Sequence, residues 1–204
     1  MHVQQNDPDE VLEVFDASGH GTGRSKSRAV IHLDGDWHAA FHCWILRRNG
    51  QEVVLQRRAL TKDTFAGLWD AAAAGHWRYG ESAAEAAREI TEELGIQVEF
   101  DRLTYHGQER IDRAFPNGLI DREFHEIYVL HDDRPLSHYR PDPAEVIGLA
   151  AFPLERLISL AAGDVASIDA TEPINLSLSR DELVPYSADR LRRNLGRASR
   201  VDKI

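Results

Sequence analysis

The most informative stretch of this chain runs from residue 75 to residue 96 and reads GHWRYGESAAEAAREITEELGI. Ser82 followed three residues later by Glu85 has the spacing of a capping box, which begins a helix. Gly95 is typical of the residue that ends one. Strong helix formers, chiefly Ala, Glu, Arg and Leu, fill the interval. The stretch therefore predicts a glycine-containing turn followed by a helix that begins at Ser82 and ends at Gly95.

Four glutamates of this helix fall within one narrow sector when residues are spaced about 100° apart, and its apolar side chains lie roughly opposite. The four are Glu85, Glu89, Glu92 and Glu93. Like charges three and four residues apart destabilise a helix slightly, and a cation between them relieves that repulsion. Carboxylate oxygens suit hard ions such as Mg²⁺ or Mn²⁺. From the spacing alone, a metal site and a solvated acidic helix face are both open.

The same stretch resembles the Nudix box, whose pattern is G-x5-E-x7-R-E-U-x-E-E-x-G-U, where U is a bulky apolar residue. The matching residues are Gly75, Glu81, Arg88, Glu89, Ile90, Glu92, Glu93, Gly95 and Ile96. The interval between Glu81 and Arg88 holds six residues instead of seven, which affects the first half of the pattern more than the second. The resemblance implies a Nudix fold and Mg²⁺ or Mn²⁺ as cofactor.

Composition limits the partners of this chain. Its 204 residues are 42% hydrophobic and 28% charged, which is enough for one well-buried core. A net charge of −10 argues against a nucleic-acid polymer or a membrane face, whereas a small phosphorylated substrate can bind through a metal. Cys43 is the only cysteine, so we expect no intrachain disulfide and a reducing compartment such as the cytoplasm. The sequence shows no long apolar run and no leader pattern, so we expect neither a membrane span nor secretion.

Hydrophobic alternation and turn residues predict a single domain over residues 1–204. Strands are expected at 10–16, 39–46, 51–58, 70–74, 97–105, 123–130 and 146–152, and helices at 153–162 and 187–195, besides the box helix. The domain core is expected at about 28–162, after a β-hairpin at 10–30 and before a C-terminal extension at 163–204. The resemblance implies an α+β Nudix fold, with a mixed β-sheet sandwiched between helices (α/β/α). The extension is either packed on the domain or an oligomer arm, so a homodimer is compatible with it.

Within this family, residues 10 to about 162 resemble isopentenyl-diphosphate isomerase and its hydrolase-like bacterial relatives. The segments that carry the resemblance are GTG at 21–23, HLDGDWHAAFHCW at 32–44, QRRALTKDTFAGLWD at 56–70, AGH at 74–76 and HEIY at 125–128. In the isomerase, three histidines and two late glutamates bind a metal. The matching residues here are His32, His38, His76 and Glu126. The second late glutamate would fall on Phe124, so that ligand is absent.

The isomerase also needs a catalytic cysteine just before the box histidine, where this chain has alanine in DAAAAGH at 70–76. A thiol is needed to protonate and deprotonate carbon, whereas the box carboxylates are needed for metal-assisted attack of water on phosphorus. We therefore expect a Nudix hydrolase that cleaves a phosphoanhydride bond in a nucleoside diphosphate derivative or a similar small organic diphosphate. The alternatives are an isomerase-like activity and a Nudix ligand-binding module without turnover.

The expected site combines the box carboxylates with a histidine and a carboxylate from a later strand. Its metal ligands are expected to be Glu89, Glu92, Glu93, Glu126 and His76. The general base is expected to be Glu93 or Glu92, with Glu126 and Glu145 as the next choices. Glu126 is a lone carboxylate in an apolar strand, where it needs a metal or a catalytic proton as partner. Arg88 is expected to orient the glutamates through an ion pair.

Three cations lie at the end of the strand at 51–58 and just after it. They are Arg57, Arg58 and Lys62. Beside a carboxylate helix, such cations could hold the distal phosphate of a diphosphate bidentately. A solvated loop is the alternative explanation for the same three side chains.

Overall fold

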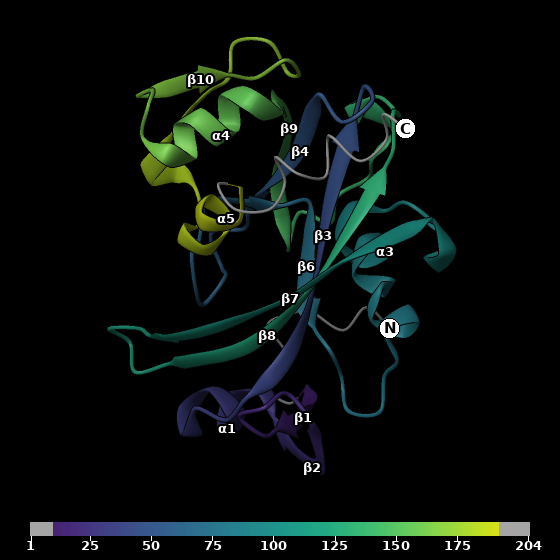
Figure 1. Cartoon of the computed structure of the whole chain (residues 1–204), viewed down its shortest axis with the longest axis vertical. Coiled ribbons are helices and arrows are strands. Elements are labelled where there is room, and N and C mark those ends of the chain that lie inside the picture. Colours follow the sequence, from purple (N-terminus) through teal and green to yellow (C-terminus); the bar gives the residue numbers. More distant parts are fainter. Residues whose placement is uncertain (1–9, 192–204) are drawn as a thin grey trace.

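A mixed sheet of seven strands positions the rest of the chain in the computed structural model, which describes residues 10–191. The strands are β3 (His38–Arg47), β4 (Glu52–Arg58), β5 (Trp69–Ala71), β6 (Ala73–His76), β7 (Leu103–Ala114), β8 (Ile120–His131) and β9 (Val146–Pro153). Their order is β5-β4-β3-β8-β7, with β6 paired to β3 and β9 paired to β4 (Figure 1). Only β3 and β8 run parallel among these pairs.

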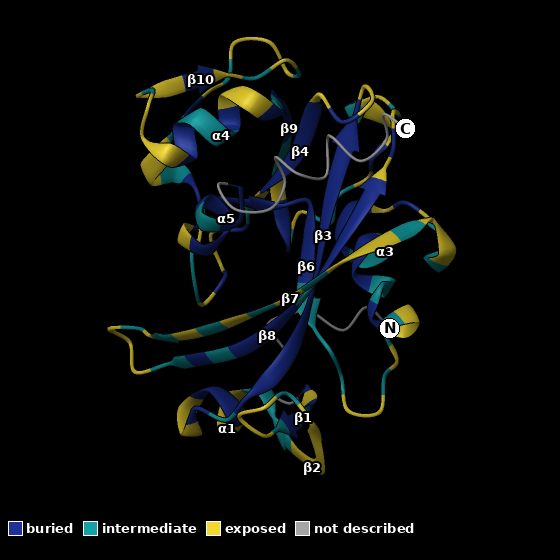
Figure 2. Cartoon of the chain, viewed as in Figure 1, coloured by how far each residue is buried: buried dark blue, intermediate teal, exposed yellow. Residues whose placement is uncertain are grey.

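Strand β3 lies in the middle of the sheet, between β4 and β8, and all ten of its residues are buried. Successive side chains of a strand point to opposite faces. Trp44 and Leu46 accordingly pack in one core cluster, and Cys43 and Ile45 pack in the other. A near-continuous apolar run is typical of a strand that is covered on both faces. Figure 2 shows β3 and its neighbours buried along most of their length.

Helices cover both faces of this sheet, which confirms the expected α+β sandwich. Helix α4 (Leu154–Ala162) packs against the cluster that contains Trp44, together with the small sheet of β10 (Ser167–Asp169) and β11 (Ser177–Ser179). Helix α3 (Arg88–Leu94) buries Ile90 and Leu94 in the opposite cluster. No helix within residues 10–191 is long and apolar enough to cross a bilayer.

The N-terminal hairpin is present, as predicted, and a short helix follows it. Strands β1 (Val11–Phe15) and β2 (Gly21–Ser27) pair antiparallel, and α1 (Arg28–Asp34) leads into β3. Helix α1 was not predicted, because seven residues are too few for a helical period to show. This helix matters for the site, since it carries Arg28 and His32.

The helix expected at 187–195 begins earlier than predicted. Helix α5 spans Pro185–Arg190 and has proline in its first turn, where a missing backbone N–H costs nothing. The remainder of the predicted helix, from residue 192, lies outside the described residues. The organisation of residues 1–204 as one domain stays a prediction.

The box helix is interrupted, which corrects the prediction of one continuous helix. Helix α2 covers Ala83–Ala86 and α3 covers Arg88–Leu94, with Ala87 between them at φ −64° and ψ −8°. The capping box of Ser82 and Glu85 is present as predicted. Glu85 is exposed and its carboxylate is bonded to Ser82, so it does not join the other box carboxylates. The break falls in the interval that is one residue shorter than the Nudix pattern.

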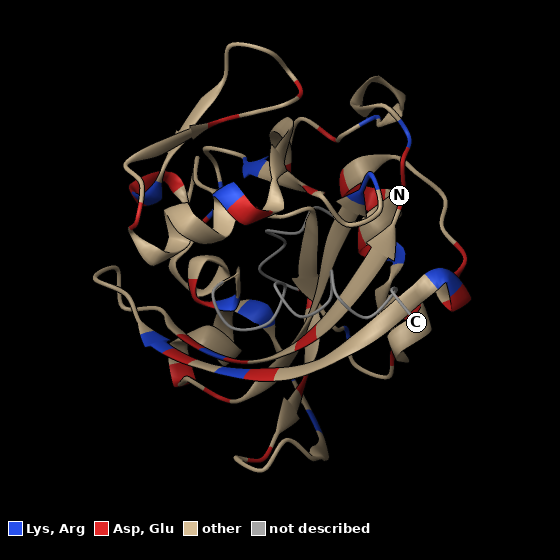
Figure 3. Cartoon of the chain, turned by 45° about the horizontal axis from the view of Figure 1, so that its top comes forward, with Lys and Arg blue, Asp and Glu red and all other residues tan. Residues whose placement is uncertain are grey.

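The prediction of a strand at 97–105 is wrong over most of that range. Residues 97–99 are irregular, Phe100–Arg102 is a 3-10 turn, and β7 starts at Leu103. Basic and acidic side chains alternate along the β7–β8 hairpin (Figure 3). A charged edge strand lacks the apolar alternation that identifies a half-buried one, and its charges discourage pairing with other chains. The turn expected at Asn117-Gly118 does connect the two strands, with φ +88° at Gly118.

Gly95→Ala is expected to lower the free energy of unfolding by more than about 3 kcal/mol. Gly95 has φ +64°, and a Cβ there would lie 2.3 Å from the backbone oxygen of Arg140. Gly80→Ala is the control, because Gly80 has φ +82° but nothing within 4 Å of its Cβ position. In that variant the free energy of unfolding should fall by only about 1 kcal/mol, because alanine is strained in a left-handed backbone conformation. Urea unfolding of both variants measures the difference, and equal losses would contradict the clash.

Candidate active site

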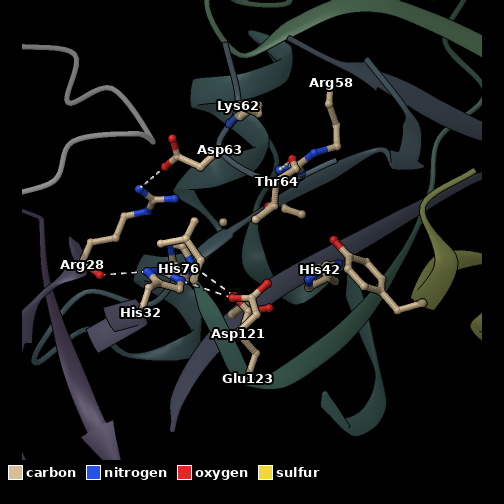
Figure 4. Close-up of a pocket in the computed structure, with 15 residues that line it drawn as sticks. Arg28, His32, His42, Arg58, Lys62, Asp63, Thr64, His76, Asp121 and Glu123 are labelled. Carbon is tan, nitrogen blue, oxygen red and sulfur yellow. Dashed lines mark hydrogen bonds and ion pairs between the residues drawn. The ribbon is translucent and has the colours of Figure 1, made fainter. Parts of the chain in front are cut away.

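A cavity of about 60 Å³ lies where α1, β6, β8, α5 and the loop after β4 meet. Its cationic lining residues are Arg28, Arg58 and Lys62. Its histidines and carboxylates are His32, His42, His76, Asp63, Asp121 and Glu123. Figure 4 shows the imidazole and carboxylate side chains gathered below Lys62 and Arg58, with Arg28 to one side. The chain thus brings together residues that are far apart in sequence.

Three histidines and one glutamate form a compact group in this wall, which we call the histidine–glutamate group. Its members are His32, His38, His76 and Glu123, whose ligand atoms all lie within 4.8 Å of one another. Glu123 Oε1 is 3.0 Å from His76 Nε2 and 3.4 Å from His38 Nε2. Three imidazole nitrogens and a carboxylate are a donor set that suits a divalent transition metal such as Mn²⁺ or Zn²⁺.

The outer nitrogens of two of these rings are held by backbone carbonyls. His32 Nδ1 is 2.8 Å from the oxygen of Arg28, and His38 Nδ1 is 3.0 Å from the oxygen of Asp36. A carbonyl only accepts, so each Nδ1 carries a proton and each Nε2 faces the group. His38 Nε2 is buried without a hydrogen-bond partner. A cation between these nitrogens and the carboxylate would replace a proton there, and the clustered ligand atoms fit a metal ion.

His76 is neutral in this environment, as a metal ligand must be. Burial lowers the pKa of its ring to about 3. Its Nδ1 lies 3.9 Å from Glu10 Oε2, on the side away from Glu123. His76 therefore lies between Glu123 and Glu10, and Glu10 in turn pairs with Arg78.

The box carboxylates form a second cluster, which arginines bridge. Arg88 donates to Glu81 Oε1 at 2.7 Å, to Glu92 Oε2 at 2.8 Å and to Glu89. Arg78 donates to Glu10 at 3.0 Å and lies 3.6 Å from Glu92. The cluster thus contains four glutamates, three from the box and Glu10 from the hairpin, but only two guanidiniums. It keeps an excess of negative charge that a divalent cation could offset. Neither Glu89 nor Glu92 lines the cavity as it stands.

Glu93 is a buried box carboxylate that contacts residues of the cavity wall. Its Oε2 accepts from Gln56 Nε2 at 2.9 Å and from the backbone N–H of Ala74 at 2.8 Å. Its Oε1 is buried without a hydrogen-bond partner and lies 4.0 Å from Lys62 Nζ. Burial raises the pKa of Glu93 to about 7. A carboxylate that titrates near neutrality beside two cavity-lining residues suits a general base.

The contribution of Glu93 to the free energy of unfolding of the metal-free protein is expected to fall as the pH rises from about 4.5 to 7, whereas the contribution of His76, whose pKa is about 3, rises with pH below about 6.5. The pKa of Glu93 is about 7 in the folded chain against an ordinary 4.5, so in this window the folded state keeps a proton that the unfolded state has lost. Glu93→Gln removes the ionisation. The free energy of unfolding of the variant should therefore exceed that of the wild type by about 2–3 kcal/mol at pH 8, and by little at pH 4.5. Urea unfolding in EDTA at both pH values measures this, and a pH-independent difference would contradict it.

The structure does not bring Glu126 to either cluster, which corrects the prediction that it binds the metal. Glu126 accepts from Tyr105 Oη at 2.7 Å and from Gln108 Nε2 at 2.6 Å, both on β7. Glu123, three residues earlier on β8, faces the histidines instead, because side chains of a strand alternate between its faces. Sequence analysis missed Glu123, and the signal that could have found it is the alternation of Asp121, Glu123 and His125.

Two of the three predicted phosphate ligands line the cavity, and Arg57 does not. Arg57 is exposed, and its Nε donates to the oxygen of Gly67 at 3.0 Å. Arg58 lies 3.4 Å from Asp70, and Lys62 pairs with Glu145. The third cation of the cavity is Arg28, from helix α1. In the sequence it belongs to a basic cluster with Arg24 and Lys26 that is either a solvated edge or a contact for a substrate phosphate.

No thiol lines this cavity in the described part of the chain. Cys43 is fully buried in the core cluster of Ile90 and Leu94, and burial raises the pKa of its thiol. Ala74 lines the cavity and belongs to the segment DAAAAGH, where the resemblance implies a cysteine in the isomerase. The acid–base thiol that an isomerase needs is therefore missing from the cavity.

Known proteins similar to this chain point to one family. A family model described as "NUDIX domain" matches residues 36–171. The uncharacterized Nudix hydrolase CA_C0446 of Clostridium acetobutylicum is 32% identical over 191 residues, which cover 87% of this chain and 91% of that protein. An isopentenyl-diphosphate Delta-isomerase of Serratia proteamaculans is 38% identical over 129 residues, which cover 62% of this chain and 69% of that protein.

The fold comparison agrees with the sequence comparison. The crystal structure of DR0079 from Deinococcus radiodurans has a TM-score of 0.60 to this chain at 19% identity. The match covers 90% of this chain and 100% of that one. At this identity the likeness supports the fold alone. The family match over two thirds of the chain and the relative that is similar over most of its length show that this protein belongs to the Nudix hydrolase family.

Proposed function

We propose that this Nudix hydrolase cleaves a phosphoanhydride bond in a small organic diphosphate or a nucleoside diphosphate derivative, with Mn²⁺ or Mg²⁺ as cofactor. The observation that carries the proposal is the convergence of two kinds of group in one cavity (Figure 4). Arg28, Arg58 and Lys62 offer positive charge to phosphate oxygens. The histidine–glutamate group offers ligands for a divalent cation on the opposite wall.

Unpartnered donors support an anionic ligand. Arg28 Nε and Arg58 Nε are buried and have no hydrogen-bond partner. A buried donor without an acceptor costs about 1–3 kcal/mol, which a phosphate oxygen in the cavity would recover. Because a cavity of about 60 Å³ holds only a few water-sized groups, it fits the reacting phosphate, and the rest of the substrate would extend beyond the mouth.

His32, His38, His76 and Glu123 would hold one divalent cation, and the oxygens of Glu89 and Glu92 are suited to another. When bound, such a cation supplies charge neutralisation at the phosphate oxygens and acidifies water. Arg88 holds Glu89 and Glu92 in place through its ion pairs. Lys62 and Arg58 would grip the phosphate that departs.

Glu93 is the general base that this arrangement favours. Gln56 and the backbone of Ala74 hold one carboxylate oxygen, so Oε1 is left to take a proton from the attacking water. Glu92 is less suited, since two arginines neutralise it. Glu145 is less suited as well, because Lys62 pairs with it. The cytoplasmic location and the homodimer stay predictions.

A substrate panel tests the proposal. Nucleoside di- and triphosphates, dinucleoside polyphosphates, sugar nucleotides, coenzyme A, NADH, thiamine diphosphate and isopentenyl diphosphate would each be incubated with Mg²⁺ or Mn²⁺. Phosphate or phosphorylated products released from any member would support the hydrolase and identify its substrate class. Proton exchange on isopentenyl diphosphate without phosphate release would replace the proposal with an isomerase. Binding without either reaction would replace it with a ligand-binding module.

A further inference from the structure

Arg190 is a buried arginine from outside the segment that the family model matches. It is the last residue of α5, whereas the match ends at residue 171. Its side chain is 0% exposed. Nε donates to Glu109 Oε2 at 3.0 Å, and Nη2 lies 3.0 Å from His125 Nδ1. Burying a guanidinium is costly, and an apolar side chain of similar size often fills such a place at lower cost, so the contact with His125 calls for a functional explanation.

The contact with Arg190 determines where His125 carries its proton. Guanidinium nitrogens only donate, so His125 Nδ1 accepts and the ring proton lies on Nε2. Nε2 then donates to Glu123 Oε2, which lies within hydrogen-bond distance. The opposite tautomer would place N–H against the guanidinium and a lone pair against the carboxylate, and both contacts would be repulsive.

The tautomer of His125 also excludes this residue as a metal ligand. The ligand atoms of His42, Glu123 and His125 lie within 4.8 Å of one another, so they could be taken for a second metal site. Both nitrogens of His125 are already engaged, one with Arg190 and one with Glu123, and no lone pair is left for an ion. His125 therefore acts on Glu123 and not as a ligand.

One carboxylate oxygen of Glu123 is held by His125, and the other faces the histidines of the histidine–glutamate group. His125 binds Oε2, while Oε1 faces His76 Nε2 at 3.0 Å and His38 Nε2 at 3.4 Å. Without the bond to Oε2, the carboxylate could rotate about its last bond and turn Oε1 away from the histidines. Partners of this kind fix the direction of a metal-binding side chain.

We propose that Arg190 is a positioning residue of the active site, which acts through the His125 tautomer to orient Glu123 in the histidine–glutamate group. The inference rests on the proposed metal site at Glu123. It gives the C-terminal helix a role: α5 completes the site, since Tyr186 of the same helix also lines the cavity.

The first test measures the tautomer in the wild-type protein and uses a variant only to assign its signals. Nitrogen-15 NMR of histidine-labelled protein reports the tautomer of each ring, and the signals of His125 are assigned by their loss in His125→Gln. We expect His125 to carry its proton on Nε2. A proton on Nδ1 would overturn the proposal, whether or not the protein binds a metal.

The second test measures Mn²⁺ binding by calorimetry. Arg190→Met keeps an unbranched side chain of somewhat shorter length and removes its donors, and the Mn²⁺ affinity should fall about 10-fold. Arg190→Lys keeps one donor for His125 and should recover part of the loss. Arg156→Met, at an exposed arginine of α4, is the control that should bind as the wild type does.

The outcomes separate this inference from the proposed function. A wild-type protein that binds no Mn²⁺ would reject the metal site, and the NMR result would still decide the tautomer. Equal Mn²⁺ affinity in the wild type and in Arg190→Met would reject the positioning role while leaving the metal site intact. If Arg190→Met does not fold, the Arg190→Lys affinity and the wild-type NMR decide the question.

Discussion

Glu93→Gln is expected to lower kcat by about 10²–10⁴-fold and to change KM by much less. The amide of glutamine keeps an oxygen for Gln56 Nε2 and for the backbone N–H of Ala74, so the packing around residue 93 is preserved. What the variant loses is the carboxylate oxygen that can take a proton from water. Steady-state hydrolysis of the substrate that the panel identifies, at saturating Mn²⁺, measures the effect.

Glu85→Gln is the matched control for this variant. Glu85 lies on the preceding helix, is exposed, and caps Ser82, a role that glutamine also fills. It should keep wild-type kcat. Persistence of activity in both Glu93→Gln and Glu92→Gln would contradict the mechanism, because it would mean that neither box carboxylate takes part. A larger loss in Glu92→Gln than in Glu93→Gln would transfer the role of general base to Glu92.

Glu123→Gln is expected to weaken Mn²⁺ binding by more than about 100-fold, and to lower kcat/KM by a similar factor. The substitution removes the only negative charge of the histidine–glutamate group, so three imidazoles alone would have to hold the cation. Calorimetric titration of the metal-free protein measures the affinity directly. Hydrolysis measured over a range of Mn²⁺ concentrations shows whether added metal restores the activity.

Glu126→Gln is the control for Glu123→Gln on the same strand. Glu126 faces Tyr105 and Gln108, away from the histidines, so its variant should bind Mn²⁺ as the wild type does. If Glu126→Gln lost more affinity than Glu123→Gln, the assignment that the isomerase resemblance implied would be right and the one that the structure supports would be wrong.

Features that depend on neighbouring residues were predicted well. The capping box at Ser82 and Glu85, the left-handed Gly95 and the turn at Asn117-Gly118 each follow from the chemistry of a few consecutive residues. Strand β3 was predicted within a residue or so, because a run buried on both faces is apolar throughout. The errors fall where that local signal is weak, in the seven-residue helix α1 and in the exposed edge strand β7.

The site was predicted only in part, for a geometric reason. A helix presents residues three and four apart on one face, so the box carboxylates could be read as a set. On a strand, a shift of one residue moves every side chain to the other face. Strand β8 pairs in regular register with β3, and this pairing places Glu123 opposite His38. Whether Glu123 or Glu126 faces the histidines therefore depends on pairing with other strands.

The sequence by itself determined the family, the α+β class, the box and its helix signals, because these lie in contiguous patterns of residue type and spacing. Only the tertiary structure decided that Glu123 joins the three histidines, that Arg57 points away from the cavity, and that α5 reaches the site. The contacts of Arg190 with Glu109 and His125 join residues more than 60 positions apart. Such contacts arise from the packing of whole elements, so they leave no periodicity or spacing in the chain that sequence analysis could detect.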